Sequence, residues 1–481
     1  MIEASFLLVL AAFVTIGLAS ATRARKSRTD YYLASRAVSP WLCGLSAVAT
    51  NNSGYMFIGV IGFTYATGLA AAWLMVGWIL GDFAGSLFIH RKLRKCTERT
   101  NEASFASVVA RWYGEEFRLW RRIAAVVMVV FLGAYAAAQI SAGGKALQGV
   151  LGWEPAAGAI VVAAMILAYS VAGGIRASIW TDAAQSMVML AAMLLLFTVA
   201  LHGQGGFYAT VESMANIPGY LDLFPDTLLF PGALGMGLFV LGWMFAGFSV
   251  VGQPHVMIRF MALDDAAHMT RARIWYYSFF TAFYALATGV GMLSRLYLPE
   301  LGGMDPELAL PTMALELLPP VLVGVILAGI FAATMSTADS LVLSCSAAIT
   351  HDLLPRRLEK TWEAKTATAV VTLLALGIAM SETRSVFQLV ILSWSTLASA
   401  FAPLLTIYAM GRRITESGAI VAMVAGVAAA LLWRAADLHT MVYEGMPGIL
   451  TGFIVAITMS RVAEHRRSEF GFYADETKGK V

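Results

Sequence analysis

The chain has 481 residues, of which 59% are hydrophobic and 13% are charged, and its mean hydropathy is +0.72. Its net charge of +3 is small for a chain of this length. Because a soluble fold needs a charged surface that this chain cannot supply, the composition excludes a water-soluble protein and predicts a polytopic protein of the lipid bilayer.

Thirteen apolar segments are candidates for transmembrane helices, which need about 20 mostly apolar residues. The first has no basic residue in front of it and several behind it, so we expect a retained span rather than a cleaved signal peptide. The predicted spans cover residues 3–21, 39–62, 67–90, 121–144, 151–173, 177–201, 229–254, 274–297, 319–350, 366–381, 385–410, 417–435 and 444–460. They form one transmembrane domain over residues 1–465, followed by a cytoplasmic tail over residues 466–481.

The basic residues of the connecting segments predict the orientation of these spans. With the N-terminus outside the cell, the cytoplasmic segments contain 29 of the 33 Lys and Arg residues. The outside segments contain only Lys145, Arg295, Arg384 and Arg434. An excess of basic residues on the cytoplasmic side is usual in multi-pass membrane proteins. We therefore expect a multi-pass protein of the cell (inner) membrane with a cytoplasmic C-terminus, and the basic loop at 91–122 needs no nucleic-acid partner to explain it.

The second predicted span contains a polar interruption. The stretch SAVATNNSGYMFIGV places four polar or flexible residues inside an apolar run: Asn51, Asn52, Ser53 and Gly54. In hydrocarbon, an unpaired backbone amide or carbonyl costs several kcal/mol, so a broken helix is tolerated only where protein or a lined cavity satisfies those groups. The stretch therefore predicts a helix break that lines a site.

A second break is predicted five spans later, in the segment 229–254. This segment contains Gly242, Gly247, Gly252 and Pro254. Gly and Pro are also common in membrane helices for packing alone, which is the alternative explanation of one break. Two breaks at matched positions instead indicate two inverted repeats, at about 39–201 and 229–410, with a binding site between them. Freed carbonyls suit sodium and half-helix N-termini suit a carboxylate, so the pattern predicts cation-coupled uptake of a small organic solute.

A third polar cluster lies in the segment 319–350. Ser336, Asp339, Ser340 and Ser344 are spaced to share one helix face, and Thr337 lies beside it. A carboxylate at membrane depth is expensive and normally faces a partner or an ion pathway. For Ser344 and Ser346, hydrogen bonding between helices or to carbonyls of the same helix is the favoured explanation, but it explains the STADS turn less well.

Five motifs together resemble the sodium/solute symporters, a family that includes the sodium/proline and sodium/glucose cotransporters. These motifs are SRAVSPW, SAVATNNSGYMFIG, YSVAGGIRASIWTD, GQPHVMIRFMA and ATMSTADSLVLSCSAAITHDL, which span residues 35–353. GQPHVMIRFMA resembles the sodium/proline branch in particular. The resemblance implies an all-α fold of the leucine-transporter type, with a 5+5 inverted repeat and about 13 transmembrane helices.

The resemblance also implies site residues. For the sodium ion it implies backbone oxygens of Ala49, Asn52 and Ala333 and hydroxyls of Ser336 and Thr337. For a second sodium, present in some members, it implies Asp182, Asp339 and Ser340, with Asp339 replacing the usual serine. For the solute it implies Asn51, Ser53, Gly54, Tyr135, Val250, Pro254 and Trp394.

Two departures from the sodium/proline branch bear on the solute. Proline transporters carry Asp at the position of Asn51, where the sugar branch carries Asn. They also carry Trp and Tyr at the positions of Ala246 and Val250. The loss of two aromatic walls favours a solute that is larger than proline or differently shaped.

We therefore expect a sodium-coupled secondary active symporter that imports a small organic solute, proline-like and either an amino acid or a small carboxylate, by alternating access. Sodium is its coupling ion, and no cofactor is expected. A membrane-embedded solute sensor with the same fold is the alternative, but such proteins usually carry an appended domain and only a short tail follows Arg461. An integral-membrane enzyme is disfavoured because the 7 histidines form no HExxH motif or paired-ligand spacing. For His255, at the cytoplasmic side of the seventh predicted span, an interfacial role is favoured over a proton relay.

Overall fold

The computed structural model describes residues 1–21, 28–299, 305–354, 360–381 and 385–478, and most of them are helical. The long helices are α1 (Ile2–Ala21), α3 (Pro40–Phe57), α5 (Ala72–Thr100), α7 (Arg118–Leu151), α8 (Pro155–Gly203), α10 (Gly232–Phe248), α12 (Met269–Tyr297), α14 (Pro320–Ala347), α15 (Thr361–Ser381), α16 (Val386–Ala409), α17 (Glu416–Ala435) and α18 (Gly445–Lys478). The shorter helices are α2 (Arg28–Leu33), α4 (Gly59–Thr67), α6 (Phe105–Ala110), α9 (Phe207–Ala215), α11 (Pro254–Met261) and α13 (Ala309–Leu317). Single turns include η1 (Ala34–Arg36), η2 (Gly68–Ala71), η3 (Ser249–Gly252), η4 (Ala266–His268), η5 (Pro306–Leu308), η6 (Ala348–Leu353) and η7 (Leu438–Thr440).

Each of the thirteen predicted spans coincides with a helix or with part of one. In the described part of the chain, ten helices are long and apolar enough to cross a membrane, and two shorter apolar helices cover Ile2–Gly17 and Pro155–Leu167. The broken pair α3 and α4 accounts for the second predicted span. The fifth and sixth predicted spans are continuous as α8, which bends at Gly174 with φ of +59°. A side chain at Gly174 would also meet the backbone oxygen of Tyr31 at 2.7 Å.

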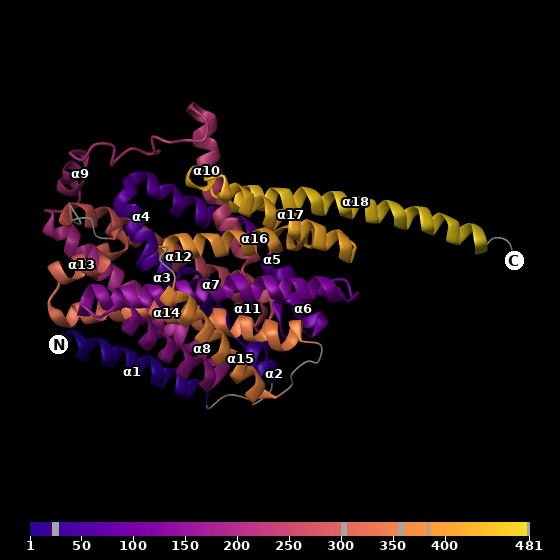
Figure 1. Ribbon diagram of the computed structural model, residues 1–481, viewed down its shortest axis with the longest axis horizontal. Coiled ribbons are helices and arrows are strands. Elements are labelled where there is room, and N and C mark those ends of the chain that lie inside the picture. Colours follow the sequence, from indigo (N-terminus) through magenta and orange to yellow (C-terminus); the bar gives the residue numbers. More distant parts are fainter. Residues whose placement is uncertain (22–27, 300–304, 355–359, 382–384, 479–481) are drawn as a thin grey trace.

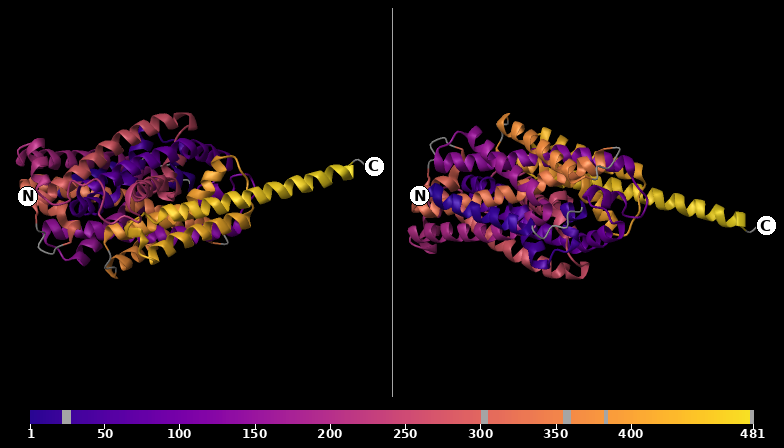
Figure 2. Two further views of the ribbon diagram at one scale, coloured as in Figure 1. Left: turned by 90° about the horizontal axis from the view of Figure 1, so that it is seen from above. Right: turned by 90° about the horizontal axis from the view of Figure 1, so that it is seen from below.

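The helices run side by side along one axis, and the two chain ends lie at opposite ends of the bundle (Figures 1 and 2). This arrangement fits an odd number of membrane crossings. Helix α18 continues beyond the bundle through most of the predicted tail (Figure 1). The assignment of the two ends to the outside and the cytoplasm stays a prediction.

Helices α14 and α16 form the centre of the bundle. The most apolar stretches of α14 and α16 are 83% and 89% buried, whereas that of α15 is only 28% buried. Helix α14 packs against α1, α3, α7 and α8, and α16 packs against α7, α18 and the turn η3. Because α14 carries the STADS turn, this packing places its hydroxyls and carboxylate at the middle of the protein rather than against lipid.

Both predicted helix breaks are present. Helix α3 is interrupted at Ser53, whose φ of +47° and ψ of 176° lie outside the helical region. Helix α10 gives way to the single turn η3, and the chain then restarts as α11 at Pro254, which suits the first turn of a helix because proline lacks a backbone N–H. A parallel β-bridge between Val38 and Leu263 ties the start of α3 to the end of α11. The bridge therefore holds the start of α3 beside the end of α11, at one end of the bundle.

Candidate functional site

The break in α3 is stabilised by side chains of its own helix and of α7. The backbone N–H of Gly54 donates to Gln139 Oε1 at 2.8 Å, and the N–H of Tyr55 donates to Ser53 Oγ at 3.1 Å. The N–H of Gly54, a predicted solute residue, is therefore already paired with Gln139 in this structure. Gln139 was not predicted, since nothing in the sequence links it to a residue 85 positions away.

The hydroxyls of α14 meet the carbonyls of α3 just before the break. Ser336 Oγ donates to the backbone oxygens of Ala49 and Ala333, at 3.2 and 3.1 Å. Thr337 Oγ1 donates to the backbone oxygen of Thr50 at 2.9 Å. Four of the five predicted sodium ligands thus lie together, and Thr50 is an additional oxygen that the sequence did not single out.

Asn52, the fifth predicted sodium ligand, is buried on α3 beside this group. Neither atom of its side-chain amide has a hydrogen-bond partner in the described part of the chain. A buried amide without partners is uncommon in a folded protein and marks a position at which a ligand can complete the polar contacts. The prediction named the backbone oxygen of Asn52, and in the structure its side-chain amide is also a candidate ligand.

The three residues predicted for a second sodium also come together. Ser178 Oγ lies 3.4 Å from Asp182 Oδ2 and donates to Asp339 Oδ1 at 3.2 Å. Ser340 Oγ lies 3.0 Å from Asp339 Oδ1. The two carboxylates therefore share one hydroxyl and are far closer than roughly 10 Å, one Debye length at 0.1 M salt.

A buried arginine occupies the middle of this carboxylate cluster. Arg259 on α11 donates to Ser178 Oγ at 2.8 Å, to Asp182 Oδ2 at 3.3 Å and to Ser340 Oγ. In the orientation argument Arg259 was counted as a charge of a cytoplasmic loop. That assignment is wrong, because α11 lies inside the bundle and the side chain of Arg259 is fully buried.

The charges of this cluster do not balance. With both carboxylates ionised, Asp182 and Asp339 exceed the single positive charge of Arg259 by one negative charge. Asp182 Oδ1 and Asp339 Oδ2 also have no hydrogen-bond partner among the described residues. A buried charge needs a compensating partner, so the cluster has the charge and the free oxygens to accept one monovalent cation.

The predicted solute residues lie around a group of aromatic rings between the two breaks. Tyr135 on α7 and Trp394 on α16 lie edge to face with ring centres 6.2 Å apart. His255 on α11 contacts both, at 5.4 Å from Tyr135 and 5.9 Å from Trp394. Its ring nitrogens have no hydrogen-bond partner in the described part of the chain. The expected interfacial role of His255 is therefore wrong, since the residue is buried with the predicted solute residues.

The turn η3 forms the second wall of this region. Val250 and Pro254 are buried there, next to the carbonyl of Ala246, which accepts from Trp394 Nε1 at 3.2 Å. Gln253 Nε2 donates to the backbone oxygen of Trp394 at 2.9 Å. The indole of Trp394 therefore lies against the backbone of Ala246, one of the two positions at which the sequence analysis expected an aromatic wall to be missing.

Asn51 faces away from the aromatic group. Its amide nitrogen donates to the hydroxyl of Tyr276 at 2.6 Å, and that hydroxyl donates to Asp82 Oδ2 at 2.7 Å. Asp82 on α5 is fully buried, and its Oδ1 has no hydrogen-bond partner among the described residues. The structure thus links the predicted solute residue Asn51 to a membrane-buried carboxylate that the sequence analysis did not single out.

Comparisons with known proteins show the family of this chain. A family model described as "Sodium:solute symporter family" matches residues 31–426. The chain is 29% identical over 464 residues to a high-affinity proline transporter of Bacillus subtilis (strain 168), covering 93% of this chain and 96% of the relative. It is also 29% identical over 459 residues to the sodium/proline symporter of Escherichia coli (strain K12), covering 92% of this chain and 89% of the relative.

Two solved structures have a similar fold. One is the substrate-bound outward-open state of a Na+-coupled sialic acid symporter, with a TM-score of 0.79, 19% identity, and coverage of 96% of this chain and 97% of that chain. The other is a nucleobase-cation-symport-1 family transporter in a closed conformation, with a TM-score of 0.59, 14% identity, and coverage of 91% and 94%. This likeness confirms the predicted all-α fold of the leucine-transporter type. The bounds of the two repeats stay a prediction.

Proposed function

The chain belongs to the sodium:solute symporter family, and from this premise we propose that it imports a small carboxylate-bearing solute, proline-sized or larger, together with sodium. The sodium-coupled symport of a solute and the multi-pass membrane location follow from the family. The nature of the solute, the ion ligands and the cell (inner) membrane as the location are proposals.

The first sodium ion is proposed to bind between α3 and α14. The supporting observation is the convergence of Ser336 Oγ with the backbone oxygens of Ala49 and Ala333, all within 3.2 Å of that hydroxyl. Thr337 and Asn52 complete the proposed set. Each hydroxyl carries lone pairs that can turn toward a cation, and hard cations prefer such oxygen ligands. An ion there would connect the broken helix to α14, so that binding of sodium shapes the solute site.

A second cation is proposed for the cluster of Asp182, Asp339 and Ser340. The support is the uncompensated negative charge beside Arg259 and the two carboxylate oxygens that have no partner in the described residues. With a serine at position 339, Arg259 and Asp182 would form a balanced pair. In this chain Asp339 adds a second negative charge, so a further cation is needed although Arg259 is present.

The solute is proposed to lie between the two breaks, against Ser53, Tyr135, Val250 and Trp394, with Asn51, Gly54 and Pro254 shaping the backbone around it. Because the N–H of Gly54 is taken, the carboxylate needs other donors. Gln139 Nε2 has no partner among the described residues, although Oε1 of the same side chain accepts from Gly54. The curated relatives named above are proline transporters, which supports an amino acid or small carboxylate as the class.

A solute screen in proteoliposomes tests this function. Uptake of proline, larger amino acids, short carboxylates, sugars and osmolytes is measured with an inward sodium gradient and with an equal potassium gradient. We expect sodium-dependent uptake of a carboxylate-bearing solute, with proline below the best one. Sodium-driven uptake of a neutral sugar alone would overturn the carboxylate proposal. Solute binding without uptake would instead support the sensor alternative.

A further inference from the structure

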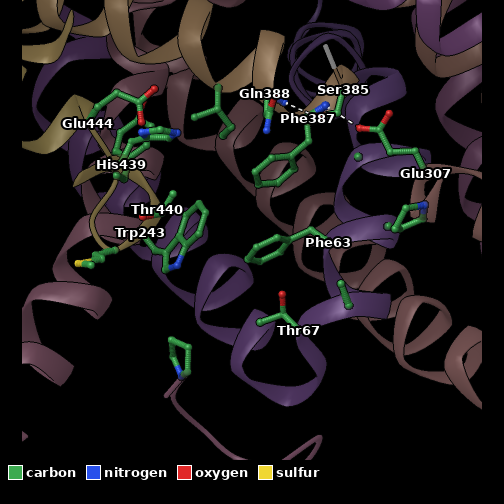
Figure 3. Close-up of a pocket in the computed structure, with 18 of the residues that line it drawn as sticks. Phe63, Thr67, Trp243, Glu307, Ser385, Phe387, Gln388, His439, Thr440 and Glu444 are labelled. Atoms are coloured by element: carbon green, nitrogen blue, oxygen red, sulfur yellow. Dashed lines mark hydrogen bonds between the residues drawn. The ribbon is translucent and has the colours of Figure 1, made fainter. Parts of the chain in front are cut away.

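A second candidate binding site lies at the end of the bundle where α16 and α18 begin. Here a cavity of about 480 Å³ is bounded by α4, α10, the turn η5 and the starts of α16 and α18 (Figure 3). On the predicted topology every one of these segments faces the outside of the cell. The volume is in the range of small-molecule pockets, about 300–1,000 Å³.

Aromatic side chains form the walls of this cavity. Phe63 and Phe387 stack with ring centres 5.0 Å apart and an angle of 12° between their planes. Trp243 lies 5.9 Å from Phe63, and Tyr443 stacks beside Trp243 at 6.5 Å. Phe63, Trp243 and Phe387 are drawn around the same space in Figure 3. Aromatic faces attract cations through their negative quadrupole, and the indole of tryptophan does so most strongly.

A buried carboxylate adds a charged anchor to these walls. Glu444, at the same cavity, is 1% exposed. Its Oε1 accepts from Arg434 Nη1 at 2.6 Å and from Ser395 Oγ at 3.2 Å. Its Oε2 has no hydrogen-bond partner in the described part of the chain. A carboxylate oxygen that is buried without a partner is costly, and a cationic ligand would satisfy it.

Among the residues that the structure describes, the acidic groups that line the cavity and the basic groups bonded to them sum to one excess negative charge. Asp305, Glu307 and Glu444 line it, whereas the basic groups bonded to them are Lys145 and Arg434. Lys145 lies 2.5 Å from both Asp305 and Glu307, so one lysine serves two carboxylates. An apolar space with a net negative charge favours a cation over a neutral or anionic ligand.

We propose that this cavity binds a small organic ammonium compound, with the ammonium group against Glu444 and the face of Trp243. The site is separate from the solute site between the helix breaks. Rings of Tyr55, Trp78 and Trp394 run from the wall residue Phe387 toward that central site, with neighbouring ring centres 5.4 to 5.9 Å apart. Binding in the outer cavity does not require sodium.

Calorimetric titration of the purified full-length protein in sodium-free potassium phosphate tests this proposal. The probe is choline, and its control is 3,3-dimethylbutan-1-ol, in which carbon replaces the charged nitrogen. We expect choline to bind at least about tenfold more tightly than the neutral alcohol. Glu444→Gln should weaken choline about tenfold and Trp243→Leu should weaken it severalfold, whereas Glu316→Gln, at an exposed acid of α13 outside the cavity, should change nothing.

Equal affinity for choline and the alcohol, or unchanged choline affinity in both Glu444→Gln and Trp243→Leu, overturns the proposal. Sodium-dependent thermal stabilisation, measured on every variant, shows that the protein is folded. If Glu444→Gln does not fold, Trp243→Leu against Glu316→Gln decides the result. Because the titration contains no sodium, its outcome is independent of whether the solute screen identifies a carboxylate.

Discussion

The residue that most changes the interpretation of the ion sites is Arg259. Its guanidinium bonds directly to Asp182 and Ser340, which sequence reasoning assigned to a second sodium, and to Ser178, which it did not single out. A guanidinium has five donors in a fixed plane and is charged at every physiological pH. It therefore acts as a permanent internal cation, and the number of carboxylates around it determines whether a mobile cation is also needed.

The first prediction tests this charge count with Asp339→Ser. The substitution leaves Arg259 and Asp182 as a pair of equal and opposite charge. No excess negative charge then remains to attract a second cation. We expect the Hill coefficient of uptake for sodium to fall from about two to about one, because one of two coupled ions is lost. Sodium titrations of initial uptake rates measure this, with Ser344→Ala on the same helix as the control. An unchanged coefficient near two contradicts the second site.

The second prediction concerns Arg259→Met with and without Asp339→Ser. Removing one partner of a buried ion pair costs about 3–5 kcal/mol because the other charge stays buried. The single variant leaves two unpaired carboxylates and should lose thermal stability and uptake. The double variant returns the cluster to one excess negative charge, so part of the stability should return. Thermal unfolding compares the two, and a double variant no more stable than the single one contradicts the electrostatic explanation.

The third prediction concerns the hydroxyls of the first site. Ser336→Ala together with Thr337→Ala removes two oxygens next to the carbonyls of Ala49 and Thr50. The sodium concentration for half-maximal uptake should rise by at least about tenfold, which corresponds to 1.4 kcal/mol of ion-binding free energy. If the double variant reaches the membrane and its uptake depends on sodium as before, the proposed first sodium site is wrong.

At the scale of single elements, the break in α3 depends on close approach of neighbouring helices. A β-carbon at Gly54 would lie 2.4 Å from Thr334 Cγ2 and 3.0 Å from Gln139 Oε1. Glycine is therefore required at Gly54 by the packing of α3 against α14 and α7. By contrast, nothing lies within 4 Å of a β-carbon at Gly237 on α10.

The fourth prediction follows from this difference. Gly54→Ala forces Thr334 or Gln139 to move, and overpacking of this kind costs about 1–3 kcal/mol. It should also reduce uptake, because the displaced groups hold the helix break. Gly237→Ala should change stability by less than roughly 0.5 kcal/mol. Thermal unfolding and uptake of both variants are compared with the unmodified protein, and similar losses in the two variants would rule out the packing explanation.

The elements were predictable to different degrees for physical reasons. The thirteen spans and both breaks follow from hydropathy and from local Gly, Pro and Asn residues, which act within one helix. The pairing of Asn51 with Tyr276, 225 positions apart, depends on how helices pack, and no local pattern encodes it. Arg259 and His255 were misplaced because α11 resembles a loop that follows a membrane span, whereas it is a half-helix inside the bundle that buries both side chains.

At the scale of the whole molecule, the proposed ion sites and the proposed solute site lie where the two broken helices meet α14, α7 and α16. The β-bridge between Val38 and Leu263 joins the two broken helices at one end, and the proposed ammonium cavity lies where α16 and α18 begin. The molecule thus has an ordered series of polar positions along its axis. Their order relative to the membrane depends on which end faces the cytoplasm.

The fifth prediction fixes this orientation. Tyr208, between the sixth and seventh predicted spans, is 88% exposed, and Met410, at the end of α16, is 55% exposed. The distribution of basic residues places Tyr208 outside and Met410 in the cytoplasm. The native Cys43, Cys96 and Cys345 are buried, which limits their reaction with a polar reagent. A membrane-impermeant maleimide should therefore label Tyr208→Cys in intact cells and Met410→Cys only after permeabilisation. The unmodified protein is the control. The opposite labelling pattern would show that the predicted orientation is reversed, with the proposed ammonium cavity on the cytoplasmic side.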